Sequence, residues 1–289
     1  MWLRGINRGY NKKIKKRTLS IILILQFVLS VFFIPTVSAE AASKQKVTVL
    51  TKSYIKEDSW DDVNQLRKYT YNKKGQIIRR DEAVQYTIYT YKKNRIVKAV
   101  WKTQKKGKIF GKDIYSYDKR GRLSKVVTYR NEGKDFIYYF KYNKKNQIVR
   151  CKVKLGKSVY DDFRFTWKNG RVTTVKELKQ DKNTYKYEYD KKGRLTGNGT
   201  YYEYEGNEYW FKENYSYIFE NNRPVRCNNT EISPDWPEGL HGAPIYYEYK
   251  TIKIDKKYKK QVQAQQMAIF NYMIENYIII DNVLLYHIW

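Results

Sequence analysis

The sequence predicts an all-β fold in which tandem antiparallel β-hairpin repeats form an elongated twisted or wound sheet, with a C-terminal helical or mixed cap. Three observations predict it. An aromatic-x-aromatic triplet recurs along the chain, as in Tyr69-Thr70-Tyr71 and Tyr115-Ser116-Tyr117. A turn signal rich in Asn, Asp, Lys and Gly follows most triplets. An apolar residue then begins a second strand-like run.

The triplets recur at intervals that are typical of a repeat array. Successive anchor aromatics are 20, 26, 25, 25, 22, 30 and 30 residues apart; they are Tyr71, Tyr91, Tyr117, Tyr142, Trp167, Tyr189, Phe219 and Tyr249. Alternate residues of a strand share one face, so both rings of a triplet should point to the same side. Each hairpin should therefore have one packed face and one wet face.

The N-terminus is typical of a secretory signal peptide over residues 1–39. Residues 1–17 contain seven basic residues and no acid, and a mostly apolar run extends from Leu19 to Ile34. Val37-Ser38-Ala39 fits cleavage after Ala39, and cleavage after Ala41 is an alternative. A retained anchor is disfavoured because the run is short for a span of ~20 residues. We expect a secreted or cell-envelope protein, and the long basic segment is typical of a Gram-positive exporter.

Residues 40–230 form the predicted repeat array, and its turns fall into two lengths. The longer turn should end in a left-handed residue, and the shorter turn contains the type I′ pair Asn169-Gly170. The predicted structural turn residues are Gly75, Gly121, Asn146, Gly170 and Gly193. Glycine, and to a lesser degree Asn, tolerates the positive φ that these turns require.

The units resemble the YD repeat of the RHS (rearrangement hot spot) proteins, whose pattern is roughly Y-x-Y-D-x-x-G-R-L. "YSYDKRGRL" (115–123) and "YEYDKKGRL" (187–195) match it fully, "YTYNKKGQI" (69–77) matches it in part, and the resemblance covers about residues 50–230. It implies a strand-rich shell or wound sheet in a secreted or surface protein. Some members of the family enclose a toxin. With seven or eight repeats, this chain resembles a short member without a toxin domain.

The segment after the array differs in composition. Residues 231–255 are predicted to be a Pro/Gly loop and a degenerate last repeat. Residues 256–289 begin with a helix-favouring stretch and end in a strongly apolar one, and we expect them to cap the array. A protein partner or a membrane surface is the alternative for this apolar segment.

The sequence does not predict an enzyme, a cofactor or a metal site. It has no His-x-x-His, Cys-x-x-Cys, G-x-S-x-G or phosphate-loop motif. The adjacent acids Asp161 and Asp162 should face opposite sides of a strand. A glycan-acting hydrolase with Asp and Glu from separate strands stays open as an alternative. Cys151 and Cys227 either pair as a disulfide or remain free thiols.

Charge suggests the partner. The net charge is +29, and removal of the seven basic residues in 1–39 leaves about +22. The candidate ligand-binding residues are in the turns: Lys73, Lys74, Lys119, Arg120, Lys144, Lys145, Lys191 and Lys192. A row of such charges suits an anionic cell-wall polymer or glycan, and strand tyrosines could stack on sugars. An anionic membrane surface and a protein-interaction scaffold are alternatives, and nucleic acid is the least favoured partner.

Overall fold

A computed structural model describes residues 44–55, 64–131 and 135–274, and residues from Gln45 onward form one compact unit. The predicted signal peptide and the end of the apolar segment lie outside the described residues. The strands are β1 (Lys44–Ile55), β2 (Asn64–Tyr71), β3 (Ile77–Asp81), β4 (Gln85–Lys92), β5 (Arg95–Thr103), β6 (Ile109–Tyr117), β7 (Leu123–Arg130), β8 (Phe136–Tyr142), β9 (Ile148–Leu155), β10 (Ser158–Lys168), β11 (Arg171–Glu177), β12 (Thr184–Tyr189), β13 (Leu195–Tyr204), β14 (Asn207–Glu220), β15 (Arg223–Ser233), β16 (Trp236–His241) and β17 (Ile245–Asp255). A short 3-10 helix, η1 (Lys256–Tyr258), and helix α2 (Lys259–Ile274) follow.

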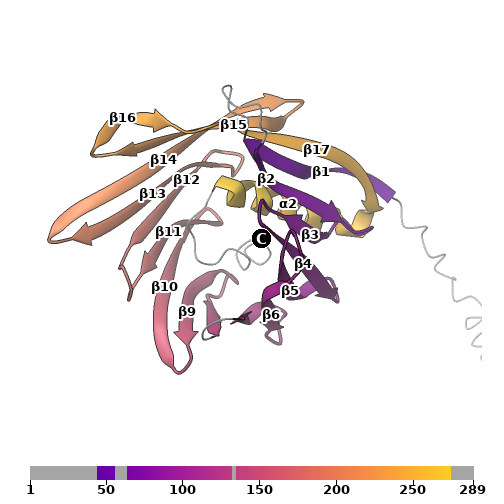
Figure 1. Cartoon of the computed structure of the whole chain (residues 1–289), viewed down its shortest axis with the longest axis horizontal. Coiled ribbons are helices and arrows are strands. Elements are labelled where there is room, and N and C mark those ends of the chain that lie inside the picture. Colours follow the sequence, from indigo (N-terminus) through magenta and orange to yellow (C-terminus); the bar gives the residue numbers. More distant parts are fainter. Residues whose placement is uncertain (1–43, 56–63, 132–134, 275–289) are drawn as a thin grey trace, which may run out of the picture. The chain divides into compact units, whose positions relative to one another are not determined.

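The strands form a closed antiparallel β-barrel (Figure 1). From β2 to β15, each strand pairs with the next one along the chain. The first half of β15 pairs with β17, and its second half pairs with β16. β17 pairs with β1, and β1 pairs with β2. Sixteen of the described strands therefore make the ring, and β16 extends it beside β15.

The expectation of an elongated twisted or wound sheet of tandem hairpins is wrong, because the two ends of the sheet join. Within the described residues, no return strand follows the triplet Tyr247-Glu248-Tyr249 on β17, and β1 takes that place. Thr51 Oγ1 donates to the Glu248 carbonyl at 3.1 Å, and the Thr48 and Thr251 hydroxyls are 3.3 Å apart. The described part of the C-terminal cap is one 3-10 turn and one helix.

The aromatic triplets place their rings in the barrel interior. The first ring of each triplet is at most 8% exposed, at Tyr69, Tyr89, Tyr115, Phe140, Phe165, Tyr187 and Tyr247, and so is Tyr215 in the overlapping triplet Tyr215-Ser216-Tyr217 of β14. The residue between the two rings is exposed at Thr70, Thr90, Ser116, Lys141, Thr166, Glu188, Ser216 and Glu248. This period of two produces a packed inner face and a wet outer face. Each large ring removes about 150–250 Å² from water, so these rings dominate the core.

The second ring of seven triplets donates a hydrogen bond to a backbone carbonyl of an earlier strand or turn. Tyr91 Oη donates to the Ile77 carbonyl at 2.7 Å, and Tyr117 Oη donates to the Ile96 carbonyl at 2.6 Å. The same type of bond joins Tyr71 to Leu50, Tyr142 to Leu123, Trp167 to Ile148, Tyr217 to Leu195 and Tyr249 to Pro224. Trp167 fits because its indole N–H can also donate. These bonds run around the ring and across the β1 closure.

The seventh anchor was assigned to the wrong aromatic residue. Phe219 faces Pro224 across the β14–β15 turn, as the spacing suggested. However, Phe219 has no donor group, and its side chain is exposed. Tyr217, two residues earlier on the same face of β14, donates to the Leu195 carbonyl instead. The requirement for a donor therefore selects Tyr217 over the better-spaced ring.

Candidate binding site at the turn end

Seven hairpin turns lie at one end of the barrel, which we call the turn end. They connect β2–β3, β4–β5, β6–β7, β8–β9, β10–β11, β12–β13 and β14–β15. The predicted turn residues Gly75, Gly121, Asn146, Gly170 and Gly193 have φ values of 76°, 78°, 62°, 77° and 87°. In the longer turns an acid or amide bonds the backbone: Asp118 Oδ1 accepts the amides of Arg120 and Arg122, both at 2.9 Å.

The longer turns also contain a matched pair of side chains. Where the first turn residue is Asp, the residue four positions later is Arg, as in Asp118–Arg122 and Asp190–Arg194, and each pair forms an ion pair. Where the first residue is Asn, its partner is Gln, as in Asn72–Gln76 and Asn143–Gln147. The backbone amide and the guanidinium of Arg122 hold the pKa of Asp118 below its usual value.

These arginines also reach the next hairpin. The Arg122 guanidinium lies 4.5 Å from the ring centroid of Tyr142, and that of Arg194 lies 4.2 Å from the ring of Phe219. Such contacts are attractive because the ring face is electron-rich. Part of the arginine charge is therefore used within the barrel. Of the turn lysines, Lys74 donates to Asn94 Oδ1 at 3.1 Å and lies 5.6 Å from the centroid of the Tyr258 ring.

The eight predicted ligand-binding residues are all exposed at the turn end. They are Lys73, Lys74, Lys119, Arg120, Lys144, Lys145, Lys191 and Lys192. Among the described residues, none of the eight forms an ion pair. Because the barrel closes, these charges follow a curved rim instead of the straight row that an elongated sheet would carry. We call these eight residues the basic rim.

A cleft of about 720 Å³ lies between helix α2 and the turns of four consecutive hairpins, from β4–β5 to β10–β11. Four cationic side chains line it: Arg95, Arg122, Lys145 and Lys260. Three rings also line it, Tyr91, Tyr142 and Trp167. Its amide side chains are Asn94, Asn146, Gln147, Gln261 and Gln265, and no Asp or Glu is among its lining residues. The cleft is therefore strongly cationic.

Only part of the cleft coincides with the predicted site residues. Lys145, Asn146, Gly121 and Gly170 line it, whereas the other seven residues of the basic rim do not. Sequence reasoning missed Arg95, Arg122, Lys260 and the glutamines. The constant four-residue spacing between Asp118 and Arg122 was the sequence signal for Arg122. In contrast, no local pattern shows that α2 would cover these turns.

Helix α2 is held in place by packing and by specific hydrogen bonds. Tyr258 and Val262 are buried against Val47, Val49 and Ile254. The amide of Gln266 joins two strands: its Oε1 accepts the Leu50 N–H at 2.6 Å, and its Nε2 donates to Tyr71 Oη at 3.2 Å.

One further bond fixes the helix to the mouth of the cleft. Gln261 Nε2 donates to the Asn94 carbonyl at 3.2 Å. Helix α2 therefore forms a fixed wall of the cleft.

Gln265 is the most informative residue of this wall. Its side chain is 7% exposed, and in the described part of the chain its Nε2 has no hydrogen-bond partner. A buried donor without an acceptor costs about 1–3 kcal/mol. An oxygen acceptor placed in the cleft would satisfy this donor.

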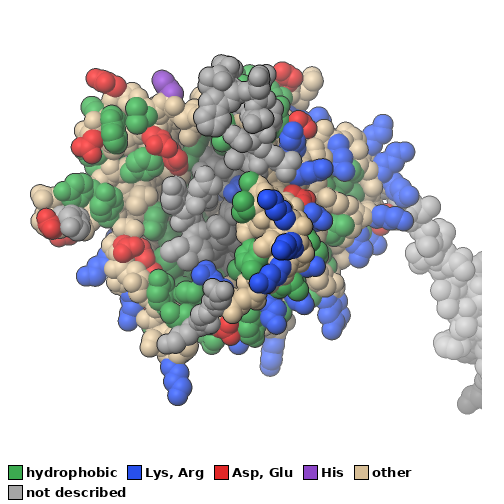
Figure 2. Space-filling view, viewed as in Figure 1, with side chains coloured by type: hydrophobic (Ala, Val, Ile, Leu, Met, Phe, Trp, Pro, Cys, Tyr) green, Lys and Arg blue, Asp and Glu red, His purple; other side chains and the backbone are tan. Residues whose placement is uncertain are grey.

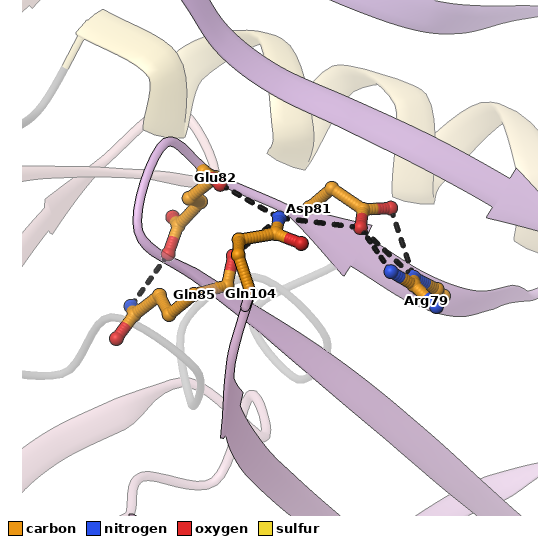
Figure 3. Close-up of polar contacts among 5 residues, drawn as sticks. All are labelled: Arg79, Asp81, Glu82, Gln85 and Gln104. Atoms are coloured by element: carbon orange, nitrogen blue, oxygen red, sulfur yellow. Dashed lines mark hydrogen bonds and ion pairs between the residues drawn. The ribbon is translucent and has the colours of Figure 1, made fainter. Parts of the chain in front are cut away.

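Other polar clusters lie away from the turn end. At the β3–β4 connection, Gln104 Nε2 donates to the carbonyls of Glu82 and Gln85, and Arg79 pairs with Asp81 (Figure 3). These contacts hold a loop together, since each of the five residues in Figure 3 is bonded to another residue of the same cluster. Within the described ranges, no group of three or more His, Cys, Asp or Glu could hold a metal ion.

A carboxyl pair from separate strands lies inside the barrel. Asp161 on β10 is 1% exposed and Glu177 on β11 is 4% exposed. Burial and the adjacent Asp161 raise the pKa of Glu177 to about 8. Asp162, next in sequence, points instead to Arg150 and forms an ion pair with it. Solvent hardly reaches Asp161 and Glu177, so the pair offers no open surface to a glycan.

The two cysteines are both buried and both free thiols in this structure. Cys151 lies on β9 and Cys227 on β15. Burial raises the pKa of the Cys227 thiol to about 12. Of the two alternatives for this pair, the structure therefore has the free thiols. Among the described helices, none is long and apolar enough to cross a membrane.

No family model and no curated protein matches the sequence. Among solved structures, a porin-like protein from Bacteroides uniformis aligns with 72% of this chain and 96% of its own, with a TM-score of 0.50 and 13% identity. A porin-like protein from Bacteroides vulgatus covers 71% of this chain and 99% of its own (TM-score 0.35, 14% identity). A TcdB2-TccC3-TEV structure aligns with 66% of this chain and 14% of its own chain, with a TM-score of 0.32 and 10% identity.

The first of these likenesses supports a closed barrel and corrects the family resemblance. At 13% identity it concerns the fold alone. A barrel closed by β1 and β17 is not the elongated shell or wound sheet that a YD/RHS repeat protein implies. The YD/RHS assignment is therefore wrong for this chain, although the short strings that suggested it do form turns.

Proposed function

We propose that this protein is an exported, noncatalytic β-barrel of the cell envelope that binds an anionic glycan or similar polyanion at its turn end. One repeating unit of the polymer would lie in the cleft beside α2, and the basic rim would attract the rest. The observation that carries the proposal is the cleft itself, with four cations, three rings, no acid and the unpartnered buried amide of Gln265.

Electrostatics supports an anionic ligand. Within the described part of the chain, Arg95, Lys145 and Lys260 form no ion pair, so their charges are not neutralised internally. Concave sites lined by one sign of charge concentrate oppositely charged ligands. Tyr142 and Trp167 add flat apolar surface against which a sugar ring can pack.

The outer wall supports a location in water. Its exposed positions between the aromatic pairs are Thr, Ser, Lys and Glu, and further exposed positions include Lys68, Lys112, Arg164 and Lys186. A barrel wall that faces lipid needs an apolar band about 25 Å tall. The polar wall and the expected signal peptide favour an exported protein that is retained at the envelope by its ligand.

Co-sedimentation with bacterial cell walls, with and without teichoic acid, over a salt series would test the proposal. The protein without residues 1–39 should bind teichoic acid-containing walls and dissociate as salt rises. Neutralising the cleft with Arg95→Gln, Lys145→Gln and Lys260→Gln should weaken binding. It should also lower the log-log salt slope by about 2, at about 0.7 per lost contact.

A matched control carries Lys105→Gln, Lys106→Gln and Lys157→Gln, which remove the same charge from exposed turns at the opposite end. This control should keep nearly all binding. Equal losses in the two triple variants would refute a specific cleft, because net charge alone would then explain binding. A further variant, Gln265→Leu, should lower affinity several-fold without changing the salt slope.

A further inference from the structure

We infer that the barrel self-associates end to end, with two acidic, aromatic hairpin tips of one copy bound to the basic rim of a second copy. The tips belong to hairpins β13–β14 and β15–β16. This inference goes beyond the proposed ligand binding and does not depend on the identity of the ligand. It predicts, however, that a polyanion and a second copy compete for the same rim.

The charges of the chain are unevenly distributed. Residues 227–249 contain Glu231, Asp235, Glu238 and Glu248 and no Lys or Arg, although the whole chain carries a net charge of +29. The β13–β14 tip adds Glu203, Glu205 and Glu208. Figure 2 shows acidic and apolar side chains together over β13 to β16, whereas Lys and Arg gather elsewhere on this face.

The same tips expose large aromatic and apolar side chains. Tyr202 and Tyr209 stack across the hairpin with centroids 5.5 Å apart, and they are 41% and 39% exposed. On β16, Trp236 is 56% and Leu240 is 48% exposed. Exposed rings surrounded by acids form a surface that suits cationic side chains, which can contact a ring face and a carboxylate together.

The chain already uses this chemistry near the tips. The Lys186 ammonium lies 3.9 Å from the centroid of Tyr201, and that of Lys212 lies 4.9 Å from the centroid of Trp210. In contrast, none of the tip acids Glu203, Glu205, Glu208, Asp235 and Glu238 has an ion-pair partner among the described residues. The tips and the basic rim are therefore complementary surfaces whose charges are unpaired within one chain.

Geometry places the two surfaces at opposite ends of the barrel. Strand β13 starts beside the turn that contains Lys191 and Lys192 and runs away from the turn end to the β13–β14 tip. Strand β15 starts at Arg223, beside the β14–β15 turn, and runs away from the turn end to the β15–β16 tip. Two copies can therefore dock tip to rim without using the same surface twice. Such a heterologous contact leaves one free tip and one free rim, so it can extend into longer assemblies.

Sedimentation velocity without any polyanion would test this inference. The protein without residues 1–39 should form dimers and larger species at low salt and return to monomer at high salt. Tip reversal, Glu205→Lys with Glu208→Lys, should abolish association. A matched control, Glu188→Lys with Ser116→Lys and Thr166→Lys, changes the net charge equally at exposed positions of the wall and should still associate.

A charge swap makes the test specific. Rim reversal, Lys119→Glu with Arg120→Glu, should also prevent association, but a mixture of the tip-reversed and rim-reversed proteins should assemble. A parent protein that stays monomeric at low salt up to millimolar concentration, or a mixture that fails to assemble, would overturn the inference. The tip-reversed protein keeps the basic rim and the cleft, so it should still bind cell walls. Its wall binding therefore tests the proposed function separately from self-association.

Discussion

Replacing Glu177 by Gln should stabilise the barrel near neutral pH and remove most of its loss of stability between pH 5 and 8. Glu177 and Asp161 are both buried inside the wall. Burial and the charge of Asp161 raise the pKa of Glu177 from 4.5 to about 8. In this window the folded chain holds a proton that the unfolded chain has released. Stability therefore falls as pH rises from about 4.5 to about 8.

The size of the effect follows from the two pKa values. Each pKa unit corresponds to about 1.4 kcal/mol of differential interaction. The value pH 7 lies about 2.5 pH units above the pKa of Glu177 in the unfolded chain and below its pKa in the folded chain. Over this interval only the unfolded chain loses the proton, which lowers the free energy of unfolding by about 3 kcal/mol. Gln keeps the shape of the side chain and cannot ionise, so Glu177→Gln should gain about this amount at pH 7 and little at pH 5.

Urea unfolding followed by tryptophan fluorescence at pH 5, 6, 7 and 8 would measure this difference. Glu188→Gln removes an exposed carboxylate on the neighbouring strand and controls for the loss of one acid. The reasoning fails if Glu177→Gln and Glu188→Gln have the same stability profile over this pH range. It also fails if Glu177→Gln is less stable than the parent protein at pH 7.

Three further predictions concern the wall and its turns. Tyr117→Phe removes the hydroxyl bonded to the Ile96 carbonyl and should cost about 1–3 kcal/mol in urea unfolding, whereas exposed Tyr139→Phe should be nearly neutral. Gly121→Ala should lower the melting temperature more than Gly206→Ala: both residues have positive φ, but a Cβ at Gly121 would lie 2.0 Å from Arg95 Nη2 and one at Gly206 would meet nothing within 4 Å. Cys151 and Cys227 should resist a thiol reagent in the native protein and react after unfolding in urea without reductant; no reaction in urea would show that they are paired.

Features that depend on neighbours in sequence could be inferred without coordinates. The aromatic alternation assigns the packed face of the strands, and the positions that require positive φ are marked by Gly75, Gly121 and Asn146. The pairing of Asp118 with Arg122 and of Asn143 with Gln147 is also visible as a fixed spacing, although its meaning became clear only from the contacts.

Features that join distant segments could not be inferred. Closure pairs Thr48 with Thr251, and nothing near either residue indicates its partner. The cleft combines turn residues such as Arg95 and Lys145 with Lys260 and Gln265 from a helix at the far end of the chain. The sequence alone therefore does not distinguish the cations of the cleft from the many other Lys and Arg residues of the chain.

The closure by β1 and β17 has a consequence for biogenesis. Of the described strands, β17, which completes the ring, is the last to be synthesised and its partner β1 is the first, so an emerging chain cannot finish the wall until β17 is present. Contacts between such distant segments form slowly because the intervening chain must first be ordered. For the export that we propose, this order of synthesis predicts that the barrel closes only after the whole chain has crossed the membrane.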